Sequence, residues 1–103
     1  QLSRSDGRLN FNHTAQELER QVRAFHPWPG TFTFWDQKRL IVHRARAANV
    51  TSPGIGVLTR VEGHPAVGTS QGILILEQVQ PAGKSSMPGE AFLRGAHDWP
   101  DPR

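Results

Sequence analysis

Apolar residues recur every three or four positions between residues 14 and 25, with polar residues between them. This spacing predicts an amphipathic helix. Thr14 and Glu17 form the T-x-x-E pattern of a capping box, in which each side chain accepts a hydrogen bond from the other residue's backbone amide. We therefore expect the helix to begin just after Thr14. Pro27 disfavours helical backbone at the residue before it, so we expect the helix to end at about Phe25. The apolar stripe consists of Ala15, Leu18, Val22 and Phe25.

The stretch AFHPWPG, residues 24–30, places two prolines, a tryptophan and a glycine directly after this helix. Pro29 and Gly30 suit a type II turn, because proline presets the first central dihedral angle and glycine accepts the positive second one. We expect a rigid structural elbow that directs the chain from the helix into a strand. Large aromatic residues at such corners usually anchor packing, so we expect Trp28 to be buried, the alternative being an exposed ligand platform. The elbow residues are Pro27, Trp28, Pro29 and Gly30.

Beyond the elbow, the helical spacing gives way to short alternating runs that predict strands. The expected strands are TFTFW (31–35), KRLIVHRARA (38–47), residues 55–61, AVGT (66–69) and ILILEQVQ (73–80). MPGEAFLRG (87–95) predicts a short closing helix with Met87, Phe92 and Leu93 facing inward. The predicted fold is mainly β: a small OB-like five-stranded barrel, closed or partly open, with an entering N-terminal helix and a short C-terminal helix.

The length of 103 residues fits one domain. Residues 1–13 are polar and lack periodicity, so we interpret them as an entering linker. Residues 14–95 form the expected folded domain, and residues 96–103 are expected to be a frayed tail. The sequence has no cysteine, which excludes a disulfide framework and a thiolate metal site. No apolar run approaches the roughly 18 residues of a membrane span, so no membrane partner is expected.

Positive charge is concentrated in one quarter of the chain. The formal net charge is +3, and five of the basic residues lie between residues 37 and 61, where no acidic residue occurs. Concentrated basic charge permits a nucleic-acid partner without requiring one. A charge run of this kind is as often simply a solvated face, and composition alone leaves both interpretations open.

Local patterns for metal binding and catalysis are not found. The five histidines, at positions 13, 26, 43, 64 and 97, lack the short spacings of metal pairs, so no metal site is predicted. GHPAVGTS (63–70) imitates a phosphate-binding loop but has Thr69 where the lysine belongs. No G-x-S-x-G elbow occurs. We therefore predict no catalytic residue in this chain.

The basic residues are the strongest candidates for binding. In a strand over residues 38–47, Arg44 and Arg46 would share a face about 7 Å apart, where their guanidinium groups could engage neighbouring phosphates. Lys38 would lie on the same face, Arg39 and His43 on the other. A barrel could still gather most of these charges along one groove, with Arg60 contributed by the next strand. Lys84 is added because the tight PAG turn before it would project its side chain. The six candidate contacts are Lys38, Arg39, Arg44, Arg46, Arg60 and Lys84, and Arg20 and Arg23 are weaker candidates.

Aromatic side chains bear on which feature of a nucleic acid would be read. Phe32, Phe34 and Phe92 are expected in the core, which leaves no obvious set of exposed rings for stacking bases. This favours recognition of phosphate and shape. It argues against a free-standing OB-fold that binds single strands, which is a further alternative.

Several segments together resemble one known family. They are DGRLNF (6–11), AQELERQVRAFHPWPGTFT (15–33), KRL (38–40), PGIGVL (53–58) and QPAGKSSMPGEAFLRG (80–95). Over residues 6–95 they resemble the C-terminal domain of methionyl-tRNA formyltransferase, and R-A-F-x-P-W-P-G and Q-P-x-G-K-x-x-M are the most specific motifs. In that family the domain is an OB-like barrel, tethered by a linker to an N-terminal catalytic domain.

The resemblance implies a function. The family transfers a formyl group from 10-formyltetrahydrofolate to initiator methionyl-tRNA, at the start of translation in the cytoplasm. The resemblance implies that this domain binds the tRNA and that residues 1–13 are the end of the interdomain linker. It also implies that the domain contacts its own N-terminal catalytic domain and that the whole protein is a monomer. The family's catalytic motifs are absent here, so we expect this chain to be inert alone and to need no cofactor. The alternative is a scaffold barrel of a related folate or nucleotide-sugar formyltransferase that does not bind RNA.

Overall fold

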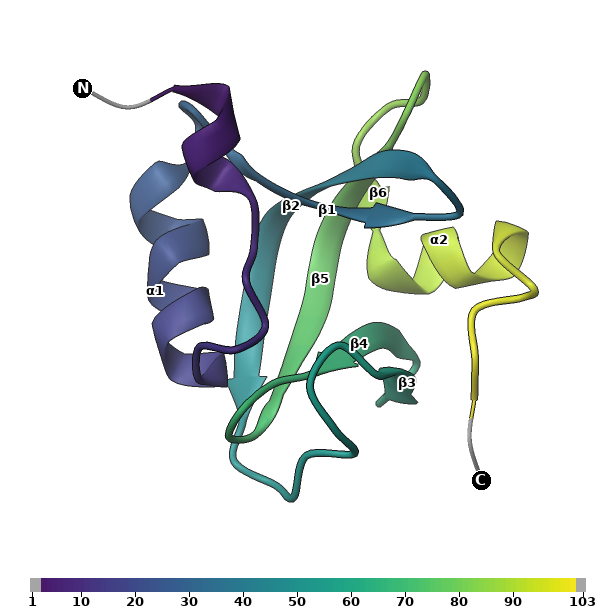
Figure 1. The fold of residues 1–103 in the computed structure, drawn as a ribbon. Coiled ribbons are helices and arrows are strands. Elements are labelled where there is room, and N and C mark those ends of the chain that lie inside the picture. The colour runs from purple at the N-terminus through teal and green to yellow at the C-terminus, as the bar shows by residue number, and fades with distance from the viewer. Residues whose placement is uncertain (1–2, 102–103) are drawn as a thin grey trace.

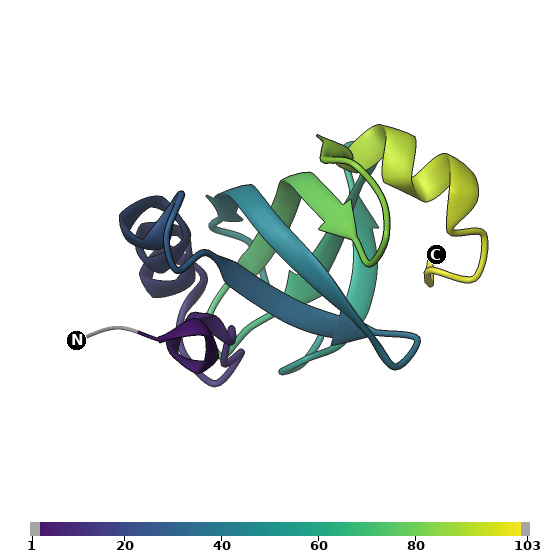
Figure 2. The ribbon, with the colours of Figure 1, turned by 90° about the horizontal axis from the view of Figure 1, so that it is seen from above.

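The computed structural model describes residues 3–101, which form one curved sheet flanked by helices. The elements in chain order are η1 (Arg4–Gly7), α1 (Ala15–Phe25), β1 (Thr31–Trp35), β2 (Lys38–Ala48), β3 (Leu58–Val61), β4 (His64–Gly68), β5 (Ile73–Pro81), β6 (Met87–Pro88) and α2 (Gly89–Gly95). Figures 1 and 2 both show η1 and α1 on one side of the strands and α2 on the other. Neither described α-helix reaches the length and hydropathy that a membrane crossing requires.

The sheet is antiparallel and open. Its strand order is β1-β2-β5-β4-β3, and the two-residue strand β6 pairs with β5 outside this path. The prediction of a mainly β fold with a helix before and after the strands is confirmed. The five-stranded barrel is not closed, because β1 and β3 stand at the two ends of the strand order and do not pair within residues 3–101. β3 has only four residues and follows a long loop without a strand, so this end of the sheet offers little edge for closure.

The capping box at the start of α1 is confirmed. The Thr14 hydroxyl accepts from the Glu17 amide at 3.1 Å, and the Glu17 carboxylate accepts from the Thr14 amide at 2.8 Å. The helix ends at Phe25 as predicted, because Pro27 requires extended backbone at His26, where ψ is 133°. Ala15, Leu18 and Val22 are buried, so α1 packs through the predicted stripe.

The main core joins α1, the strands and α2. Leu18 and Val22 of α1 meet the inward side chains of β2 and β5 and those of α2 in one buried cluster. A smaller cluster of Ala66, Ile73 and Ile75 forms separately and is flanked by Ala48 and Val61. Because β5 contributes alternate residues to the two clusters, both of its faces are covered over residues 73–76.

The predicted phase of the first strand is wrong for Phe34 and Trp35, whereas the predicted burial of Phe32 is confirmed. Trp35 packs against the main core, whereas Phe34, expected in the core, is 46% exposed. Phe32 is buried, but outside the main cluster, under the guanidinium group of Arg39. Alternation alone cannot choose between the two faces of TFTFW, since both carry aromatic residues. The choice is made by Trp99 and Phe92, whose rings lie 5.8 and 5.3 Å from that of Trp35.

Both terminal segments pack against the domain, where we had expected loose chain. Leu9 is buried, and its amide donates to the Phe32 carbonyl at 2.9 Å. Trp99 is 1% exposed, and its indole nitrogen donates to the Thr59 carbonyl at 2.8 Å. The expected frayed tail is therefore wrong for residues 96–99, because a large aromatic side chain completes the core there. The role of residues 1–13 as an interdomain linker stays a prediction, and residues 1–2 and 102–103 lie outside the described residues.

Replacing Trp99 should destabilise the domain strongly. Trp99→Ala removes the largest fully buried side chain and should lower the free energy of unfolding by about 3–5 kcal/mol. Urea unfolding of this variant, beside the exposed neighbour Pro100→Ala, measures the difference. A loss below about 1 kcal/mol in Trp99→Ala would show that the tail is not part of the core.

The capping box should make stability depend on pH. Hydrogen bonds from the amide and hydroxyl of Thr14 lower the pKa of Glu17 below its ordinary value of 4.5. A carboxyl with a lowered pKa contributes its stability above the unfolded pKa and loses it as pH falls through the folded one. Glu17→Gln keeps an acceptor oxygen without titrating, so its melting temperature should fall less steeply below about pH 4.5. Gln16→Ala, on the same turn, should retain the native slope, and an equal slope in Glu17→Gln would contradict the prediction.

Candidate nucleic-acid interface

A paired irregularity in β2 and β5 decides where the basic side chains of β2 point. Val42 pairs with Val79, Arg44 with Gln78, and Ala45 with Leu76, so one residue is skipped in each strand. Leu40 and Val42 lie in the core before the irregularity, and Ala45 packs against the core after it. The skipped residues are His43 and Glu77. His43 and Arg44 therefore line the same cleft, and our prediction that they lie on opposite faces is wrong, because a bulge shifts the alternation by one residue.

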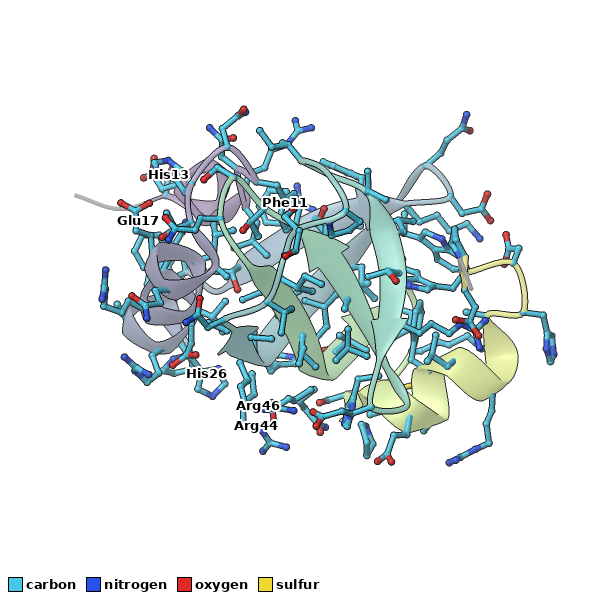
Figure 3. All side chains as sticks on the ribbon, turned by 90° about the horizontal axis from the view of Figure 1, so that it is seen from below. Phe11, His13, Glu17, His26, Arg44 and Arg46 are labelled. Carbon is cyan, nitrogen blue, oxygen red and sulfur yellow. The ribbon has the colours of Figure 1, made fainter. Side chains whose placement is uncertain are left out.

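The first of three neighbouring clefts, the helix-end cleft, lies where the end of α1 faces β2 and β5. It encloses about 590 Å³. The rings of His26 and His43 meet edge to face at 5.6 Å, and the Nε2 atom of His43 lies 2.9 Å from the Gln80 side-chain oxygen. Its two permanent cations are Arg44 and Arg23, which forms an ion pair with Glu19 at 2.8 Å, and no acidic residue is among its described lining residues. Figure 3 shows His26, Arg44 and Arg46 projecting from the same side of the molecule, away from His13 and Phe11.

The second, the elbow cleft, lies between the elbow and the outer face of β1 and β2. It encloses about 210 Å³ and shares His43 with the helix-end cleft. The carbon at the centre of the Arg39 guanidinium group lies 4.0 Å from the centre of the Phe32 ring. Trp28 lines this cleft and is 61% exposed, so our prediction of a buried anchor is wrong. Gly30 has the predicted positive φ, 83°, and its amide donates to the Phe25 carbonyl at 2.8 Å across a turn over residues 26–29, while a type II turn centred on Pro29 and Gly30 stays a prediction.

The third, the hairpin cleft, lies beside the turn between β1 and β2. It encloses about 130 Å³ and brings together Lys38, Arg39 and Lys84, three of the six predicted contacts. Asp36 is the only acidic residue among its described lining residues. Arg39 also lines the elbow cleft, so the hairpin and elbow clefts share Arg39, as the elbow and helix-end clefts share His43. We call their permanent cations the cationic track: Arg23, Lys38, Arg39, Arg44 and Lys84.

Arg46 lies beside this track but is engaged by two carboxylates. Its guanidinium group lies 2.6 Å from the Glu62 carboxylate and 3.3 Å from that of Glu77. Hydrogen bonds to these acids raise the pKa of Arg46, and its guanidinium group in turn lowers the pKa of Glu62. Arg44 has one longer contact, 3.4 Å from Glu77, and its side chain is 67% exposed. Arg44 is therefore the more accessible cation of the pair that we predicted.

Arg60 lines none of the three clefts. Its Nε and one terminal nitrogen donate to the carbonyl of Trp99 at 3.2 and 2.7 Å. This arrangement ties β3 to the C-terminal segment, so the structure gives Arg60 a tertiary contact that a solvated lysine or arginine would lack. The sequence could not reveal it, because the partner is a backbone atom of a segment that we expected to be frayed.

Residues outside the six main candidates also lie in or near these clefts. Arg23, a weaker candidate from the sequence, and His26 line the helix-end cleft from the end of α1, and outside the clefts the Arg8 guanidinium group lies 5.1 Å from the centre of the Phe34 ring. The sequence offered some indication of Arg23, because it lies in the last turn of the predicted helix. It offered none of Arg8, because Arg8 is placed by a single β-bridge to Phe32.

The fold and the clefts define a small mainly β domain with a cationic surface along one strand. The chain belongs to the formyl transferase C-terminal domain family, which matches residues 1–97. The resemblance that we drew from its motifs is confirmed at this level.

Curated relatives point to one branch of this family. The chain is 38% identical over 99 residues to methionyl-tRNA formyltransferase of Chloroflexus aurantiacus (strain ATCC 29366 / DSM 635 / J-10-fl). This match covers 93% of the chain and 32% of the relative. The chain is 42% identical over 95 residues to methionyl-tRNA formyltransferase of Myxococcus xanthus (strain DK1622), and this match covers 91% of the chain and 30% of the relative. The chain thus spans about a third of the length of the curated relatives it matches.

A solved structure supports the fold. HypX from Aquifex aeolicus, crystallised in complex with tetrahydrofolic acid, superposes with a TM-score of 0.73 over 90% of this chain and 17% of that one. The sequence identity is 14%, so the likeness concerns the fold alone.

Arg44 and Arg60, which lie on β2 and β3, should differ in their effect on stability. Arg60→Ala removes both donors from the partly buried Trp99 carbonyl and should cost about 1–3 kcal/mol of unfolding free energy. Arg44→Ala removes one exposed ion pair and should change it by less than about 1 kcal/mol. Chemical unfolding of both variants measures this, and equal losses would contradict the structural role of Arg60.

Proposed function

We propose that this chain is the tRNA-holding domain of a methionyl-tRNA formyltransferase whose catalytic domain lies outside the sequence. The observation that carries the proposal is the set of three neighbouring clefts that share Arg39 and His43, with Asp36 as the one acid among their described lining residues. From Lys38 to Arg44 the strand spans about 20 Å at roughly 3.3 Å per residue. That length matches several phosphates of one nucleic-acid strand.

The division of labour within the enzyme follows from this placement. The proposed reaction transfers a formyl group from 10-formyltetrahydrofolate to initiator methionyl-tRNA, and we assign none of this chain's residues to the folate. The domain binds the tRNA backbone and so raises the effective concentration of the acceptor end at the catalytic domain. Such an enzyme would act in the cytoplasm, where translation begins.

The cations of the track have different parts in this binding. Lys38 and Lys84 are exposed ammonium groups at the hairpin cleft and act as point charges on phosphates. Arg44 presents a mostly exposed guanidinium group that can engage a phosphate with two donors. Arg46 must first exchange its contacts with Glu62 and Glu77, so we rank it below Arg44. Arg60 has the lowest rank, because its donors already serve the Trp99 carbonyl.

Salt titration of tRNA binding tests the proposal. Four or five phosphate contacts predict a slope near −4 in a plot of log affinity against log salt, if the coefficient for duplex DNA applies approximately. The double variant Arg44→Gln, Lys84→Gln should weaken binding at least about tenfold at low salt and make the slope shallower by about two. Fluorescence anisotropy with labelled initiator tRNA measures both quantities.

A matched control separates the track from net charge. Arg20→Gln, Arg94→Gln removes the same charge from exposed positions that line none of the three clefts, and it should bind nearly as the native chain does. Equal weakening in the two double variants would contradict a localised track. Absence of saturable binding by the folded native chain at low salt would contradict tRNA holding and favour a scaffold domain of a related formyltransferase.

A further inference from the structure

The elbow cleft differs from the rest of the track because it combines a permanent cation, Arg39, with the exposed aromatic ring of Trp28. Trp28 is 61% exposed and lines the cleft, and Phe34, farther along β1 and outside the lining, is 46% exposed. These are the exposed aromatic residues whose expected absence argued from the sequence for recognition by phosphate and shape alone. Their presence reopens the question of what the elbow cleft holds.

The rings and arginines form one stacked arrangement. The guanidinium group of Arg39 lies 4.0 Å from the centre of the Phe32 ring and 5.9 Å from that of Phe34. Arg8 lies 5.1 Å from the centre of the Phe34 ring, and the two phenylalanine rings meet edge to face at 5.6 Å. A guanidinium group that rests on an aromatic face keeps its edge donors available to an anion.

The chemistry of the cleft restricts its occupant. Trp28, Pro29 and Ile41 supply apolar surface, while Arg39 supplies positive charge, and no acidic residue is among the described residues that line the elbow cleft. An occupant that suits both must carry a flat apolar part and a negative charge. A nucleotide has both. A paired nucleotide keeps its base inside the helical stack, so only an unpaired one can offer its face to a side chain.

We propose that the elbow cleft binds an unpaired RNA nucleotide, with the base stacked on Trp28 and its phosphate held by Arg39. This inference rests on the proposed function and extends it, because it adds a contact to a base at a defined place beside the phosphate contacts. Arg44 lies next to His43, the residue that the elbow and helix-end clefts share, and contacts a neighbouring phosphate of the same RNA strand.

Two RNA hairpins with equal numbers of phosphates test the proposal on the 103-residue chain. One hairpin is fully paired, and the other ends in a short unpaired 3′ extension. Trp28→Leu should weaken binding of the extended hairpin by roughly tenfold and that of the paired hairpin by less than about twofold. Trp28→Phe keeps a ring and should retain most of the affinity. Ile55→Ala, at an apolar residue of similar exposure that lines none of the three clefts, is the matched control and should bind as the native chain does.

Tryptophan fluorescence gives a second readout that does not depend on Trp28→Leu. The extended hairpin should quench the native chain, and the quenching should disappear in Trp28→Phe, because Trp35 and Trp99 pack in the main core. Melting temperatures of all variants report folding. If Trp28→Leu does not fold, the comparison of native and Trp28→Phe quenching decides the matter.

The outcomes separate this inference from the function on which it rests. If the native chain binds both hairpins and Trp28→Leu is unaffected, or weakens both equally, the nucleotide site is wrong and the phosphate track remains. If the folded native chain binds neither hairpin nor initiator tRNA, the proposed function fails and the inference fails with it.

Discussion

The paired skip at His43 and Glu77 is the constraint on which the surface of this domain depends. A regular ladder along β2 and β5 would alternate strictly, and Val42 and Ala45 could not both face the main core. Because each strand omits one residue at the same point, the core side is kept on both sides of the irregularity. As a result, His43 and Arg44 both lie on the outer face. A packing requirement of the core thus creates the junction between the helix-end and elbow clefts.

Acidic residues determine which of the neighbouring arginines stay accessible. Glu77 approaches both Arg44 and Arg46, but only Arg46 has a second carboxylate, that of Glu62. Glu62 follows the last residue of β3, so its position depends on the turn that connects β3 to β4. Two arginines that look equivalent in the sequence therefore have unequal freedom to bind an anion. The accessible charge of the surface is set by tertiary structure more than by the number of basic residues.

The sequence predicts local structure well because local structure has local causes. The capping pair Thr14 and Glu17, the stop before Pro27 and the positive φ of Gly30 each depend on residues a few positions apart, and the structure has all three. The phase of TFTFW depends instead on Trp99, more than sixty residues away. The same holds for the candidate site. Concentration of basic residues pointed to β2, whereas the shift of His43, the contact of Arg60 and the exposure of Trp28 each depend on partners distant in the chain.

The entering segment and the elbow are in direct backbone contact. At Gly7 a side chain would collide with the carbonyl oxygen of Gly30, so the two backbones touch directly. Two residues on, the Leu9 amide donates to the carbonyl of Phe32, which itself lines the elbow cleft. The entering chain therefore meets the walls of that cleft through backbone contacts, at Gly30 and at Phe32. A displacement of residues 7–9 would act on those walls without passing through a flexible side chain.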